Sequence, residues 1–287
     1  MEQNIRITEP ASSIRRMARM ELRGRWKTAI FAYILFAFLI SAPTALIELL
    51  FGGSVDIFAT YALTARELRA QTMIMLYIAI IEGPLLLGLS VFTLSLIRGA
   101  KHGPGMILDG FNNFFRAFGL FLLFSIFVFL WSLLFVIPGI IASFAYSQAF
   151  LLLADNPRIG LRYALKESRA LMIGNKWKLF CLGLSFFGWI CLTALVFFIV
   201  MVPVAVFPVS LPGFSSAFSD YPVAVVSQVL SFIVYIVFAP VYMYMLTAQA
   251  IFHDILTGRR RLSPPRDGFN AAAVGAPGEN DRDSGSE

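Results

Sequence analysis

The chain has 287 residues, of which 58% are hydrophobic and only 14% are charged, and its formal net charge is +6. Soluble domains are typically about 45–50% apolar and about 25% charged, so this composition excludes an ordinary soluble protein. It predicts an all-α bundle of helices embedded in lipid. Cys181 and Cys191 lie ten positions apart in one apolar segment. That spacing is about 15 Å along a helix, too far for a disulfide.

The first 27 residues form a basic segment that we expect to lie at the membrane interface. Four cations share one face of the expected helix: Arg15, Arg16, Arg19 and Arg23. Apolar side chains cover the opposite face, a pattern typical of helices that lie on an anionic lipid surface. Ser12 or Ser13 can cap the first turn of this helix.

Six apolar segments are expected to cross the bilayer, each of which needs about 20 residues as a helix. The expected spans are residues 28–51, 72–97, 117–137, 139–154, 179–202 and 223–252. The uncharged stretch 117–154 is too long for one span. We therefore place a hairpin at Pro138-Gly139, where proline ends one helix and glycine allows the chain to reverse. Pro240 is expected to kink the last span.

The distribution of cations supports six spans. Of the 23 Lys and Arg residues, only Arg66 and Arg69 then fall on one side of the membrane, and the other 21 fall on the side of both termini. Cytoplasmic flanks carry an excess of Lys and Arg, so both termini are expected in the cytoplasm. A single span over 117–154 would put the cations of residues 155–178 on the wrong side.

A second basic amphipathic helix is expected on the inner side, at about residues 157–173. Asn156 and Pro157 resemble an N-cap and the first helical residue, and Gly174 can end the helix. Three cations share its polar face: Arg162, Lys166 and Arg169. Two compatible arrangements remain open, in which the helix lies on an anionic leaflet or packs beneath the bundle.

Two further segments are expected to lie outside the spans. Residues 203–222 contain four prolines and one charge, and we expect them at the outer interface rather than in water. Residues 258–287 have little apolar surface to bury and are expected to form a disordered cytoplasmic tail.

The sequence contains no pattern typical of a catalytic or metal site. We find no GxSxG, Walker or HExxH motif and no Cys/His cluster, so neither an enzyme, a cofactor nor a metal is predicted. His253-Asp254, at the inner end of the last span, is interpreted as a capping and solvation feature.

Glu82, in "IAIIEGPLLLG", is the main candidate for a functional residue within a span. A carboxylate inside the bilayer is costly and is a functional hypothesis by default. Pro84 can free backbone carbonyls beside it, which suits a cation or proton site. The alternative is a protonated Glu82 that bonds a neighbouring helix. Gln148 and Gln249 are further polar candidates, although Gln within a span most often joins helices.

Three stretches carry a resemblance to a known family: "LRGRWKTAI", "IPGIIASFAY" and "NPRIGLRYALKESRALMIGNKWKLF". In this order they resemble the bacterial polytopic membrane proteins known as domain of unknown function nine-seven-five. The resemblance runs from about residue 13 to about residue 257. Its most specific positions are Ser168, Met172, Gly174 and Lys176. It implies a bacterial plasma membrane, but no activity or catalytic residue, and Glu82 is not part of its pattern.

Two functions remain open. The first is a non-enzymatic protein that organises or assists other membrane components through its basic inner face. Its partners would be anionic lipid or another membrane protein, and not nucleic acid. The alternative is a permease or exporter of a small solute or lipid, with Glu82 in a polar path. Few intramembrane charges favour the first, and a polar cavity reaching Glu82 would favour the second.

The six-span arrangement can be tested with topology reporters fused at Gly139 and after Gly174. We expect an external signal at Gly139 and a cytoplasmic signal after Gly174, because an even number of spans separates the latter from the N-terminus. A cytoplasmic signal at Gly139 would contradict six spans.

Overall fold

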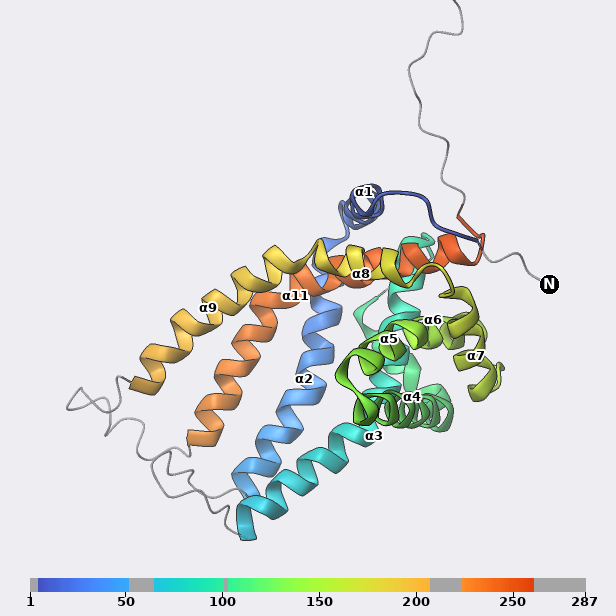
Figure 1. Cartoon of the computed structure of the whole chain (residues 1–287). Helices are drawn as coiled ribbons and strands as arrows, with labels where there is room; N and C mark the ends of the chain where they lie inside the picture. The colour runs from blue at the N-terminus through green and yellow to red at the C-terminus, as the bar shows by residue number, and fades with distance from the viewer. Residues whose placement is uncertain (1–4, 52–64, 101–102, 207–222, 261–287) are drawn as a thin grey trace, which may run out of the picture.

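The computed structural model describes residues 5–51, 65–100, 103–206 and 223–260 (Figure 1). Most of the segment 203–222 and the tail beyond Arg260 lie outside these residues. The described residues form helices and no strand, so the all-α prediction is confirmed. The elements are α1 (Ala11–Leu22), α2 (Trp26–Phe51), α3 (Ala65–Ile97), η1 (Pro104–Asn113), α4 (Phe114–Leu134), α5 (Val136–Tyr146), α6 (Ala149–Asp155), α7 (Leu161–Leu171), α8 (Lys176–Leu184), α9 (Phe187–Val206) and α11 (Val223–Leu256).

Five stretches of helix in the described residues are long and apolar enough to cross a membrane: Trp26–Phe51, Leu68–Ile97, Pro104–Leu134, Val136–Asp155 and Phe232–Leu256. A sixth results if α8 and α9 count as one span, although they meet at 43°. The count of six therefore holds when this bent pair is included. The side on which each terminus lies stays a prediction.

Proline bends two of the long helices. Pro84 lies inside α3 and Pro240 inside α11, and both helices change direction in Figure 1. Proline has no N–H to donate to the carbonyl four residues before it, and its ring pushes that carbonyl away. The kink expected at Pro240 is thus present, and α3 has a second one.

The hairpin within the stretch 117–154 turns at Phe135, so its expected place at Pro138-Gly139 was wrong. Phe135 has extended backbone angles, φ −160° and ψ 151°, between α4 and α5. Pro138 lies in the first turn of α5, where its missing N–H costs nothing. A Cβ on Gly139 would lie 2.0 Å from Ser132 Oγ. Glycine therefore lets α5 approach α4 closely and does not make the turn.

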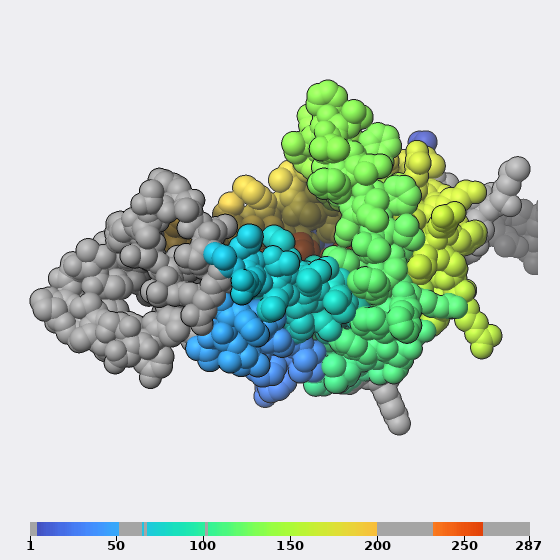
Figure 2. Space-filling model, turned by 90° about the horizontal axis from the view of Figure 1, so that it is seen from below, coloured from blue at the N-terminus to red at the C-terminus, as the bar shows by residue number. Residues whose placement is uncertain are grey.

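The tip of this hairpin is apolar and exposed. Leu133, Phe135 and Val136 are each about 70% accessible. Figure 2 shows the green hairpin of α4 and α5 extending beyond the neighbouring helices. Side chains of this kind are suited to contact lipid.

Helix α7 packs against the bundle through its apolar face. It begins at Leu161 after the N-cap Gly160, so the predicted cap at Asn156-Pro157 was wrong. Instead, Asn156 Oδ1 accepts a bond of 3.2 Å from the amide of Arg158 and forms a turn. Ala164 and Leu165 are buried in one cluster with residues of α3, α4 and α6. Of the two arrangements left open by the sequence, packing against the bundle is therefore present.

Helix α1 is also held by protein contacts. Ile14, Ala18 and Leu22 are buried, and the N-cap is Pro10 without a side-chain cap, so the predicted serine cap was wrong. Arg15 is partly buried and donates to the carbonyl of Ser185, at 3.2 Å, where α8 ends. The other three cations predicted to contact lipid in this segment are exposed: Arg16, Arg19 and Arg23.

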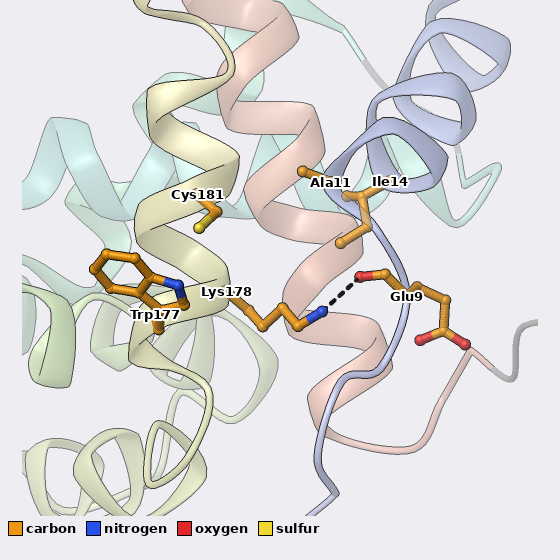
Figure 3. Close-up of a pocket in the computed structure, with 6 residues that line it drawn as sticks. All are labelled: Glu9, Ala11, Ile14, Trp177, Lys178 and Cys181. Carbon is orange, nitrogen blue, oxygen red and sulfur yellow. Dashed lines mark hydrogen bonds between the residues drawn. The ribbon is translucent and has the colours of Figure 1, made fainter.

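The segment before α1 is fastened to α8 and to the turn that precedes it. Asn175 accepts from the amide of Ile7 and donates to the carbonyl of Ile5, both at 2.9 Å. Lys178 Nζ donates to the carbonyl of Thr8 at 3.1 Å. It also donates to the carbonyl of Glu9 at 3.4 Å (Figure 3). A pocket of about 160 Å³ lies beside this contact, between α1 and α8.

Glycines allow η1 to pack against α3 at backbone distance. A Cβ on Gly88 of α3 would lie 1.8 Å from the carbonyl oxygen of Ile107. A Cβ on Gly110 of η1 would lie 1.9 Å from the carbonyl oxygen of Pro84. Small residues permit such close approach between helices in membranes.

This packing predicts that Gly88→Ala lowers the thermal unfolding midpoint in detergent, with a cost of more than about 2 kcal/mol, because the backbones must separate. Gly183→Ala in α8 is the matched control, since no atom lies within 4 Å of its added Cβ. That variant should be neutral or stabilising by up to about 1 kcal/mol. Equal losses in the two variants would contradict the close contact.

Candidate functional site

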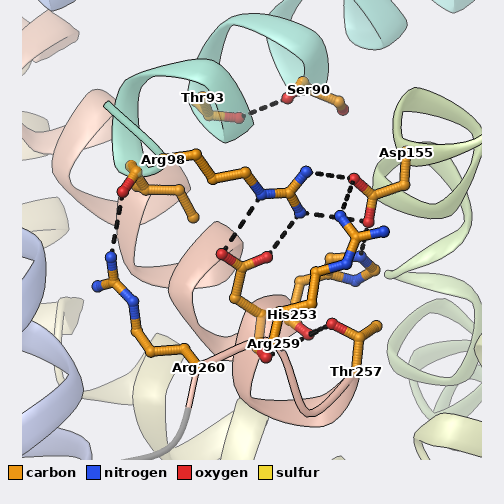
Figure 4. Close-up of polar contacts among 10 residues, drawn as sticks. Ser90, Thr93, Arg98, Asp155, His253, Thr257, Arg259 and Arg260 are labelled. Carbon is orange, nitrogen blue, oxygen red and sulfur yellow. Dashed lines mark hydrogen bonds and ion pairs between the residues drawn. The ribbon is translucent and has the colours of Figure 1, made fainter. Parts of the chain in front are cut away.

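The C-terminal ends of α3, α6 and α11 meet in one cluster of charged side chains (Figure 4). Each helix end carries carbonyl groups without helical partners and the negative end of the helix dipole. A cation at this point is favoured by all three helices. Arg98, the first residue after α3, supplies it.

Arg98 joins the three helices directly. Its Nη1 lies 2.5 Å from Asp155 Oδ1 at the end of α6, and its Nη2 lies 2.6 Å from Asp254 Oδ1 in α11. The two carboxylates are nearly buried, with 7% and 5% of their side chains exposed. Charge-assisted bonds of this length are among the stronger polar contacts in proteins.

Two further groups complete the cluster. His253 Nε2 lies 3.1 Å from Asp155 Oδ2, and Arg259 Nη1 lies 3.0 Å from Asp155 Oδ1. His253 is fully buried, and its Nδ1 has no partner among the described residues. Asp155 thus receives three donors, and the interpretation of His253-Asp254 as a simple cap was too narrow.

The Arg98 guanidinium remains protonated at any physiological pH. Burial by itself lowers the pKa of the Arg98 guanidinium, but hydrogen bonds to Asp155 and Asp254 outweigh that effect and raise the pKa above its ordinary value. The cluster therefore contains a permanent cation between two carboxylates.

Two other arginines cap the end of α3. Arg25 donates to the carbonyl of Leu96 at 2.7 Å, and Arg260 donates to that of Ile97 at 3.1 Å. Arg260 also pairs with Glu21 of α1 at 2.8 Å. Cations at a helix C-terminus bind its terminal carbonyls, so these two arginines have structural roles.

A cavity of about 170 Å³ lies between α3, the junction of α5 and α6, and α11. Five polar side chains line it: Ser90, Thr93, Ser147, Tyr242 and Gln249. The other lining residues are apolar. Ser90 and Thr93 precede Arg98 on α3 and lie near the charge cluster in Figure 4.

The structure brings together two of the three intramembrane candidates. Gln249 Nε2 donates to the carbonyl of Ser147 at 3.2 Å, and Gln148 Nε2 donates to Ser147 Oγ at 3.0 Å. Gln249 therefore joins α11 to the junction of α5 and α6, as is common for Gln in spans. Glu82 is partly buried, does not line the cavity and interacts electrostatically with Tyr242.

Sequence reasoning missed the charge cluster, although a signal was present. Arg98, Asp155 and Asp254 each lie at the inner end of an even-numbered expected span. The ends of even-numbered spans lie on the same side of the membrane, so the charges at these three ends can meet. Among the described residues, no group of three or more His, Cys, Asp or Glu side chains could hold a metal ion.

Residues 8–142 and 133–260 match the model of the family described as "Protein of unknown function (DUF975)". The chain belongs to this family. No curated protein and no solved structure matches it.

The positions that carry the DUF975 resemblance have structural roles. Ser168 Oγ donates to the carbonyl of Ala145 at 2.9 Å and accepts from the amide of Gln148 at 3.1 Å. It thereby bridges the break between α5 and α6. Met172 is fully buried, and Gly174 has a φ of +80°, which glycine adopts most easily. Lys176 begins α8.

The cluster predicts unequal costs for two neutralised carboxylates. Asp155→Asn removes the charge that faces Arg98, Arg259 and His253, and should destabilise the protein by about 3 kcal/mol, because Arg98 keeps only Asp254 and the buried His253 loses its charged partner. Glu21→Gln is the control, since its side chain is 27% exposed and its ion pair is worth at most about 1 kcal/mol. Thermal unfolding in detergent would compare them, and equal costs would argue against a central role for Asp155.

Proposed function

We propose that this protein is a non-enzymatic membrane protein of a bacterial plasma membrane that organises anionic phospholipid at its inner face. In this proposal it crosses the bilayer six times, with both termini in the cytoplasm. The observation that carries the proposal is the basic face of α7, which is exposed although the apolar face of the same helix is buried in protein.

The position of α7 in the chain supports contact with lipid headgroups. The short connections 156–160 and 172–175 join it to α6 and α8, which belong to membrane-span candidates. Because an extended residue covers at most about 3.5 Å, five residues cannot carry α7 more than about 20 Å from the end of α6. The helix therefore stays within reach of the membrane surface.

The charges of α7 support an anionic ligand. Arg162, Lys166 and Arg169 are exposed, and none of them forms an ion pair among the described residues. Packing of Ala164 and Leu165 already holds the helix in place, so the cations are free to bind another molecule. Each can contribute on the order of 1 kcal/mol near an anionic surface.

The cavity favours a second candidate function, the passage of a small solute. A path would run from Glu82 past Tyr242 to the cavity and then toward the charge cluster. Glu82 does not itself line the cavity. For this reason the exposed basic face remains the stronger basis for a function.

Replacing Arg162, Lys166 and Arg169 together by Gln should reduce the amount of phosphatidylglycerol that the purified full chain retains from mixed phosphatidylglycerol–phosphatidylcholine membranes. We expect a severalfold fall, measured as bound lipid per protein, and a weaker effect of salt on the variant than on the wild type.

The matched control replaces Arg261, Arg266 and Arg282 by Gln, which changes the net charge equally. It should retain the wild-type amount of phosphatidylglycerol. If the two triple variants behave alike, net charge rather than α7 attracts the lipid, and the proposal is wrong.

A further inference from the structure

We propose that the cavity between α3, the junction of α5 and α6, and α11 is a binding site for one small monovalent cation. The lining side chains Ser90, Thr93, Ser147 and Gln249 supply its oxygen ligands. Binding there requires neither the lipid contacts of α7 nor movement of the cation across the membrane.

The volume of the cavity limits what can occupy it. At roughly 30 Å³ for each water molecule, about 170 Å³ holds five or six waters, or one ion with part of its hydration shell. Sites for drug-sized molecules are about 300–1,000 Å³. The cavity is therefore too small to enclose a whole lipid, peptide or nucleotide.

The hydrogen bonds of the lining hydroxyls leave oxygen lone pairs to face the cavity. Ser90 donates to the carbonyl of Leu86 at 2.8 Å, and Thr93 donates to that of Leu89 at 2.9 Å. Ser147 Oγ donates to the carbonyl of Phe144 at 2.9 Å and accepts from Gln148 Nε2 at 3.0 Å, which leaves it one lone pair. A hydroxyl that gives its proton to its own helix can only accept from, or coordinate, a further partner.

The carboxamide of Gln249 also keeps an oxygen acceptor. One N–H of its Nε2 bonds the carbonyl of Ser147, which fixes the side chain between α11 and the junction of α5 and α6. Its Oε1 accepts no hydrogen bond from the described residues and remains an acceptor. Oxygen acceptors therefore come from three different parts of the chain.

The charges around the cavity suit a cation of low charge. No lining residue is basic or acidic, so the direct ligands would be neutral oxygens. Sites for Mg²⁺ and Ca²⁺ typically include carboxylates, whereas a monovalent ion needs less compensation. Outside the lining, Glu82 interacts electrostatically with Tyr242, and Arg98 and Arg259 balance the charge of Asp155.

The test is equilibrium binding of radioactive Na⁺ and Rb⁺ to the purified full chain in detergent, with choline chloride holding the ionic strength constant. We expect saturable binding of at least one of the two ions by the wild type. Thr93→Val keeps the shape of the side chain but removes its oxygen, and should weaken binding about tenfold. Ser90→Ala should weaken binding similarly and serves if Thr93→Val does not fold.

Thr193→Val in α9 is the matched control. Thr193 also donates to its own helix, at 2.8 Å to the carbonyl of Trp189, but it is only partly buried and does not line the cavity. This variant should bind the ion as the wild type does. The absence of saturable binding in the wild type would mean that the cavity holds only water, and would overturn the proposal. So would undiminished binding in both cavity variants, or equal weakening in Thr193→Val.

Discussion

The arrangement of the helices depends on the attraction between one guanidinium and the ends of three helices. The carbonyl ends of α3, α6 and α11 would repel one another if they met without a cation. Arg98 offsets that repulsion and the charges of Asp155 and Asp254, and Arg25 and Arg260 bond the last two carbonyls of α3. The C-terminal ends of these helices can therefore stay close while Pro84 and Pro240 turn the other halves of α3 and α11 in different directions.

Hydrophobic patterning was sufficient to predict the class of fold and the helical segments. It could not locate the turn of the hairpin, because every residue from Leu133 to Ile137 is apolar and no polar signal marks Phe135. Pro138-Gly139 is a common turn pair in soluble loops, but here close contact with Ser132 requires the glycine. The bend between α8 and α9 was missed for a similar reason, since the sequence around Ser185 remains apolar.

The polar residues were predictable individually but not as a group. Glu82 drew attention because it is a charge within an apolar run, whereas Asp155 and Asp254 lie at boundaries where charges are ordinary. Hydropathy does not tell which spans are neighbours, so it could not bring Arg98 to two carboxylates far away in the chain. The same limit applies to the cavity, since Ser90, Ser147 and Gln249 become a lining only when three helices pack together.

The contacts of the N-terminal segment with later parts of the chain affect the order in which the protein can fold. Ile5 and Ile7 bond the side chain of Asn175, and Tyr244 of α11 donates to the carbonyl of Arg15 at 3.0 Å. During synthesis the first residues emerge long before these partners exist. The contacts of the segment made first are therefore completed only when the last helix has taken its place. A chain interrupted before α11 would retain an N-terminal helix with part of its apolar face uncovered, which quality-control proteases could recognise.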